Sequence, residues 1–128
     1  MERIIAILLA IVLVGGCGYL PEVESGAEYR RISAGEAQEM MESYDVLILD
    51  VRTWDEFDGG HIPNAVWLPY DEILEFTDAV IYDIARIILV YCQSGRRSEI
   101  AARALVALGY LRVYDFGGIN SWTGEIVQ

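Results

Sequence analysis

The chain has 128 residues, enough for one domain, and 54% of them are hydrophobic, which predicts a packed core. Twenty acidic residues against nine basic ones give a net charge of -11, which argues against nucleic acid as a partner because phosphate backbones bind basic surfaces. Every basic residue is arginine. The absence of lysine excludes Schiff-base lysine chemistry, so an anion site must use arginine or backbone N–H groups.

The first twenty residues predict a targeting segment. Residues 4–14 form an unbroken apolar stretch of eleven residues, which fits a signal peptide and is short for a membrane span of about 20 residues. Cys17 follows two glycines, and a cysteine after two small residues resembles a bacterial lipobox, where the signal is cleaved before a cysteine that then carries lipid. We expect residues 1–16 to be such a lipoprotein signal. The alternative is an uncleaved membrane anchor over residues 4–20.

Both alternatives have the same consequence for location. The domain would be tethered to the membrane in the cell envelope, outside the cytoplasm, and the membrane would be a partner. Residues 17–28 predict an acidic linker, and residues 29–128 predict one folded domain.

Strands and helices are expected to alternate along this domain. Capping boxes begin two helices, one with Ser33 and Glu36 and one with Thr53 and Glu56. Strands are expected over residues 29–32, 46–49, 65–68, 86–91 and 113–116, and helices over 33–43, 53–58, parts of 69–85, and 98–108. This alternation predicts an α/β fold with one open parallel sheet and helices on both faces.

The last helix has the clearest pattern. Ser98 is expected as its N-cap and Gly109 as the residue that follows its end. Its apolar residues are expected to share one buried face: Ile100, Ala101, Ala104, Leu105 and Leu108.

Cys92 is the candidate nucleophile, because it ends a predicted strand and a helix follows closely. Functional sites in such folds lie at the carboxyl ends of strands, where Asp50 also falls. A thiol attacks as its thiolate, which backbone N–H groups at a helix N-terminus and nearby guanidinium groups stabilise. The loop that would surround the sulfur comprises Gln93, Ser94, Gly95, Arg96, Arg97 and Ser98.

Three blocks of residues resemble the single-domain rhodanese family of sulfurtransferases. The first runs from Asp50 through Arg52 and Glu56 to Ala65, the second is residues 92–98, and the third is Gly117-Gly118 followed by Trp122. The resemblance implies a five-stranded parallel sheet flanked by helices. It also implies sulfur transfer through a persulfide on Cys92, with no metal and no organic cofactor.

The implied donor is a small sulfur-containing anion such as thiosulfate, and the acceptor is a thiol, cyanide or a protein. Asp50, Arg52 and Glu56 are expected to form a supporting network of ion pairs and caps beside the loop. The pattern does not decide which of Arg96 and Arg97 faces the substrate. The single histidine, His61, is expected to be structural, because sulfur chemistry needs no base once the thiol is ionised.

Three alternatives remain open. One is a persulfide carrier that hands sulfur to a protein partner, and another is a binding module without catalysis. The third is a phosphatase or arsenate reductase on the same fold, whose loops resemble His-Cys-x5-Arg. Here Tyr91 precedes the cysteine and Arg97 comes one residue early, so the shorter loop favours a single sulfur over a tetrahedral phosphate.

Overall fold

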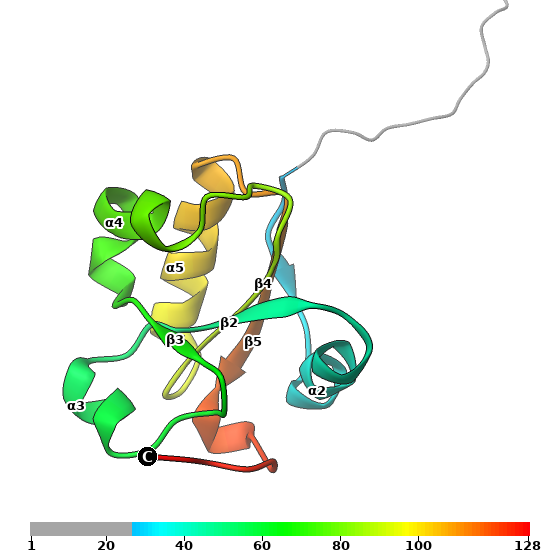
Figure 1. The fold of residues 1–128 in the computed structure, drawn as a ribbon, viewed down its shortest axis with the longest axis vertical. Helices are drawn as coiled ribbons and strands as arrows, with labels where there is room; N and C mark the ends of the chain where they lie inside the picture. Colours follow the sequence, from blue (N-terminus) through cyan, green and yellow to red (C-terminus); the bar gives the residue numbers. More distant parts are fainter. Residues whose placement is uncertain (1–26) are drawn as a thin grey trace, which may run out of the picture.

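The computed structural model describes residues 27–128, so the expectations for residues 1–26, including Cys17, lie outside the described part. Five parallel strands form one sheet in the order β1-β5-β4-β2-β3. The predicted fold class is confirmed, with Figure 1 showing helices on both sides of the sheet. The strands are β1 (Arg30–Arg31), β2 (Val46–Asp50), β3 (Val66–Trp67), β4 (Ile87–Cys92) and β5 (Arg112–Gly118).

The helices begin where the sequence supplies caps. Both predicted capping boxes are present, one at Ser33 with Glu36 and one at Thr53 with Glu56. The α-helices are α2 (Ala34–Ser43), α3 (Trp54–Asp58), α4 (Ile73–Val80) and α5 (Arg96–Ala107), and the 3₁₀ helices are η2 (Tyr70–Glu72) and η3 (Ile119–Ser121). The expected helical region between residues 69 and 85 is therefore η2 followed directly by α4.

Side chains of the central strands alternate between two apolar clusters, one on each face of the sheet. Leu49, Val90 and Cys92 lie on the face that α4 and α5 cover. Ile48, Leu89 and Tyr91 lie on the face that α2 covers. This alternation fixes which way the last residues of β4 point: Cys92 toward α5 and Tyr91 toward the opposite face.

The expectations for α5 are wrong in two respects. The helix begins at Arg96 with Gly95 as its N-cap, rather than at Ser98, because Gly95 adopts a φ of 113° that lets the chain turn into the helix at once. The face that it buries also differs, since Ile100 and Leu108 are exposed. The buried residues are Ser98, Ala101, Ala102 and Leu105.

No helix within residues 27–128 is long and apolar enough to cross a membrane.

The expected end of α5 is confirmed, because Gly109 follows it with a φ of 99° and donates its N–H to the Val106 carbonyl at 3.0 Å.

Candidate active site

Cys92 is the last residue of β4 and lies beneath the start of α5. Its side chain is buried, with 1% of its surface exposed. The backbone N–H of Gly95 donates to Sγ at 3.0 Å. The N-terminus of α5 begins at Arg96, four residues after Cys92, which brings the positive end of the helix dipole close to the same sulfur.

Only three residues, Gln93, Ser94 and Gly95, separate the strand from the helix. Ser98 lies in the first turn of α5, where its hydroxyl donates to the Gly95 carbonyl at 3.1 Å instead of capping the helix. The sequence could not show this, because serine in a first turn and serine at an N-cap leave the same local pattern. The loop is therefore tighter than the sequence indicated.

The end of β5 packs directly against this loop. A Cβ on Gly118 would lie 2.2 Å from the Gln93 carbonyl oxygen, so only glycine fits there without a backbone shift. The Asn120 N–H donates to the same carbonyl at 3.2 Å, and the Gln93 side chain donates to Asn120 Oδ1 at 2.8 Å. The glycine pair that follows Phe116 thus lets the loop and β5 approach closely.

The two arginines of the loop have different surroundings. Arg97 forms a two-pronged ion pair with Glu56, with distances of 2.8 and 3.0 Å from its Nη1 and Nη2 atoms to the carboxylate oxygens. Arg97 lowers the pKa of Glu56 to about 2. Arg96 is exposed and makes no ion pair with any residue between 27 and 128. Arg96 is therefore the loop guanidinium that is open to an incoming anion.

A buried ion pair supports the loop from β2. Asp50 and Arg52 are both almost fully buried, and Arg52 binds the Asp50 carboxylate through Nε and Nη2, at 2.7 Å for the shorter contact. Burial is the largest single influence and lowers the pKa of Arg52, but the hydrogen bond to Asp50 and the nearby negative charges, Asp50 first among them, together outweigh burial and raise that pKa.

The same pair contacts β4 and the loop that follows it. Arg52 Nη1 donates to Gln93 Oε1 at 3.0 Å, which links β2 to the active loop. The Tyr91 hydroxyl donates to Asp50 Oδ2 at 2.5 Å, and burial together with this hydrogen bond raises the pKa of Tyr91. Asp50, Arg52 and Glu56 therefore position the loop around Cys92, as hydrogen-bonded groups that are themselves fully paired.

A second supporting network lies behind the loop, and the sequence did not reveal it. Asp115 of β5 is fully buried and accepts hydrogen bonds from the Tyr29 hydroxyl at 2.7 Å and the Gly117 N–H at 2.9 Å. Arg31 Nη1 lies 3.5 Å from the same carboxylate. The guanidinium of Arg31 lies so close to Gly95 and Gly117 that a Cβ on either residue would come within 3.1–3.2 Å of Nη2.

Arg31 therefore brings a positive charge to the loop from the edge strand β1. The only signal for this in the sequence was an acidic residue inside an apolar strand, Asp115, which requires a buried partner.

His61 and Trp122 lie in structural positions. The His61 ring stacks on Phe57 with ring centroids 3.8 Å apart, and its Nδ1 lies 2.9 Å from the Phe57 carbonyl oxygen. Trp122 packs near Phe116 in the apolar cluster beneath α2. Within residues 27–128, no group of His, Cys, Asp and Glu side chains could hold a metal ion.

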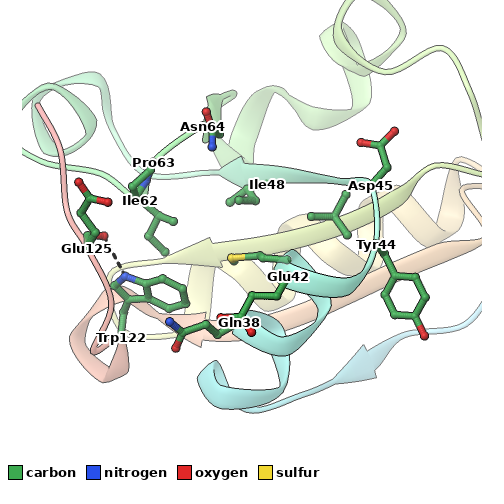
Figure 2. Close-up of a pocket in the computed structure, with 12 residues that line it drawn as sticks. Gln38, Glu42, Tyr44, Asp45, Ile48, Ile62, Pro63, Asn64, Trp122 and Glu125 are labelled. Atoms are coloured by element: carbon green, nitrogen blue, oxygen red, sulfur yellow. Dashed lines mark hydrogen bonds between the residues drawn. The ribbon is translucent and has the colours of Figure 1, made fainter.

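A cavity of about 460 Å³ lies on the other face of the sheet, beside α2 (Figure 2). Its walls include Ile48, Ile62 and Trp122, and its rim carries Glu42 and Asp45. None of the predicted site residues lines it, and Cys92 points to the opposite face. The cavity is therefore not part of the site around the thiol.

Comparison with known proteins agrees with this geometry. The family model described as "Rhodanese-like domain" matches residues 33–125. Thiosulfate sulfurtransferase GlpE of Coxiella burnetii is 36% identical over 95 residues, covering 73% of this chain and 87% of that protein. A sulfurtransferase of Allochromatium vinosum is 38% identical over 87 residues, covering 67% of this chain and 79% of that protein.

Among solved structures, the chain is similar to a rhodanese-related protein from Thermoplasma volcanium. The TM-score is 0.67 at 32% sequence identity, and the match covers 77% of this chain and 98% of that one.

Proposed function

Because the chain belongs to the rhodanese-like family of sulfurtransferases, we propose that it moves a sulfane sulfur from thiosulfate or a related anion to a thiophilic acceptor through a persulfide on Cys92. The observation that carries this proposal is the placement of the thiol. Cys92 ends a buried strand and lies at the N-terminus of a twelve-residue helix, and its Sγ accepts a hydrogen bond from the Gly95 N–H at 3.0 Å.

In the first step, the Cys92 thiolate attacks the outer sulfur of thiosulfate. A bond forms between Sγ and that sulfur, the sulfur–sulfur bond of thiosulfate breaks, and its electron pair leaves with sulfite. The product on the protein is a persulfide anion. This is covalent catalysis that divides the transfer into two easier steps.

In the second step, a nucleophilic acceptor attacks the outer sulfur of the persulfide. Cyanide gives thiocyanate, and a thiolate gives a new persulfide. The electron pair of the broken bond returns to Sγ, so the Cys92 thiolate is regenerated and no external oxidant or reductant is needed.

A chain of net charge -11 should repel an anionic donor. Positive charges at the loop offset this repulsion near the thiol. The Debye length is about 8 Å at physiological ionic strength, so distant carboxylates are screened at the thiol. Arg96 is the loop cation that makes no ion pair among residues 27–128. Arg31 and Arg97 contribute less, because Asp115 and Glu56 pair with them.

Replacement of the nucleophile tests the proposal. The Cys92→Ser variant should lose at least about 99% of thiosulfate:cyanide sulfur transfer while keeping its fold, because a serine hydroxyl of similar size forms no stable persulfide. Circular dichroism checks the fold, and thiocyanate release measures transfer. The matched control is Cys17→Ser, which changes the other cysteine and should leave transfer by the purified protein unchanged. Substantial thiocyanate release by Cys92→Ser would remove Cys92 from the mechanism.

We also propose that residues 1–16 are a lipoprotein signal that is cleaved off, and that lipid on Cys17 then holds the domain on a membrane outside the cytoplasm. The support comes from the apolar stretch of residues 4–14 and the two glycines before Cys17. Two acyl chains on one residue hold a protein stably where one chain is marginal.

A further inference from the structure

The end of the sheet where the strands begin exposes a group of apolar side chains. In a parallel sheet all strands begin at the same end of the sheet. We call the segments that lead into β1, β2, β4 and β5 the strand-start end: residues 28–30, 44–46, 81–87 and 108–112. Tyr82 is 89% exposed and Ile84 52% exposed there, and Leu108, Leu111 and Tyr44 are also exposed.

Hydrogen bonds join these segments into one surface. Arg30 donates to the Leu111 carbonyl at 3.4 Å, and the Leu111 N–H donates to the Ile84 carbonyl at 3.0 Å. Arg86 pairs with Asp45 at 3.2 Å, which brings in the start of β2. In Figure 1 the segments before β4 and β5 lie at the top of the molecule, beside the first described residues.

The charge of the strand-start end differs from that of the rest of the molecule. It carries three arginines and three acidic residues, whereas the remaining described residues carry five arginines and fourteen acidic residues. Arg112 is exposed beside Leu111 and makes no ion pair within the described residues. This surface combines exposed tyrosine, isoleucine and leucine side chains with an arginine that has no ion-pair partner among the described residues. Such a composition suits the headgroup region of a bilayer, where lipid phosphates accept hydrogen bonds from the guanidinium.

The chain also enters the domain at this end. The described part begins at Ala27 and runs at once into β1, whose start lies beside Leu111. In the tether proposed above the chain begins at lipidated Cys17, so nine residues, 18–26, separate the lipid from Ala27, and such a segment spans at most about 32 Å. Lipid on Cys17 therefore keeps the strand-start end within reach of the membrane surface.

We propose that the strand-start end lies on the lipid headgroups, with Tyr82 and Ile84 in contact with the bilayer surface. This inference rests on the membrane tether proposed above. Its consequence for function follows from the parallel sheet: Cys92 and its loop lie at the opposite end, so the active site faces away from the membrane and is open to soluble donors and acceptors.

Tryptophan fluorescence tests this orientation, because the three native tryptophans all lie near the carboxyl ends of the strands, opposite the strand-start end. Trp54 begins α3 after β2, Trp67 ends β3, and Trp122 follows β5. The full chain is made with its own leader, reconstituted into phosphatidylcholine vesicles with a minor fraction of phosphatidylglycerol, and compared with and without a lipid that carries a nitroxide quencher on its headgroup. Wild type is compared with Tyr82→Trp and with Leu74→Trp, a control at the exposed first turn of α4.

The expected result is that all three proteins sediment with the vesicles and that only Tyr82→Trp loses emission to the quencher. Sedimentation without a specific loss in Tyr82→Trp, or with equal quenching of the wild type, would overturn the orientation while leaving the tether in place. A chain that stays in the supernatant would overturn both the tether and the orientation.

Discussion

Arg96 and Arg97 are neighbours in the sequence but leave the first turn of α5 toward different surroundings. Arg97 is engaged by Glu56, and Arg96 is exposed at the mouth of the loop. Loop position alone could not separate them, because the deciding partner, Glu56, belongs to α3. We therefore propose that Arg96 recognises the anion and that Arg97, held by Glu56, positions the loop.

Replacing Arg96 should therefore weaken donor binding without unfolding the protein. We expect Arg96→Ala to raise the KM for thiosulfate roughly fivefold, since one exposed charge contact is worth about 1 kcal/mol. The kcat should change little, and Arg96→Lys should restore most of the KM. Steady-state kinetics measure both constants. An unchanged KM in Arg96→Ala would assign donor recognition to another group.

Glu56 gives a prediction about pH. Its pKa is lowered to about 2 by the hydrogen bond with Arg97, so between about pH 4.5 and pH 2 the unfolded chain binds a proton at Glu56 that the folded chain does not. The resulting stabilisation is present above about pH 4.5 and is lost as the pH falls toward 2. Since Glu56 is about a third exposed, we expect about 1 kcal/mol.

Urea unfolding of wild type and Glu56→Gln at a series of pH values measures this effect. The difference in unfolding free energy between the two proteins should shrink as the pH falls from 5 to 2. Glu36→Gln is the matched control, because Glu36 occupies the same place in the other capping box and pairs with no arginine among residues 27–128. A difference that stays constant across this range would contradict the proposed ion-pair stabilisation.

At the scale of elements, β4, the loop that follows it and α5 together position Cys92 and the backbone N–H that faces its sulfur. The sequence predicted the strand, the helix and the cysteine between them, because each has a strong apolar period or a fixed position. The N-cap of the helix was predicted three residues late, at Ser98, because Gly95 at positive φ replaces the side-chain cap that the pattern suggested. The true loop is three residues long, and its Gly95 N–H donates to the Cys92 Sγ.

Loop length should therefore decide which anion the site accepts. We expect no meaningful turnover of p-nitrophenyl phosphate by the wild type. One glycine inserted between Gly95 and Arg96 should lower sulfur transfer at least about tenfold, because it moves the Gly95 N–H and the helix N-terminus relative to Sγ.

A glycine inserted after Tyr82, at the other end of the sheet, controls for the cost of any insertion. It should leave sulfur transfer unchanged. Efficient phosphatase activity of the unaltered chain, or full sulfur transfer after the insertion beside Gly95, would overturn the argument from loop length.

At the scale of the whole molecule, the parallel sheet separates two ends with different surfaces. One end gathers Cys92, its arginines and the Asp50–Arg52 pair, and the other gathers exposed tyrosine, isoleucine and leucine side chains. The alternation of strands and helices predicted the sheet and the end on which Cys92 lies. It could not predict the contact of Arg31 with Gly95 and Gly117, because β1 and the active loop are far apart in the sequence and meet only through strand order.

The most direct test of the account is the mass of the protein after incubation with thiosulfate. The account predicts that the intact chain gains one sulfur atom, that the peptide containing Cys92 carries it, and that cyanide removes it with release of thiocyanate. Cys92→Ser should show no gain under the same conditions. A wild-type chain that gains no sulfur, or that gains it only on the peptide containing Cys17, would contradict the account.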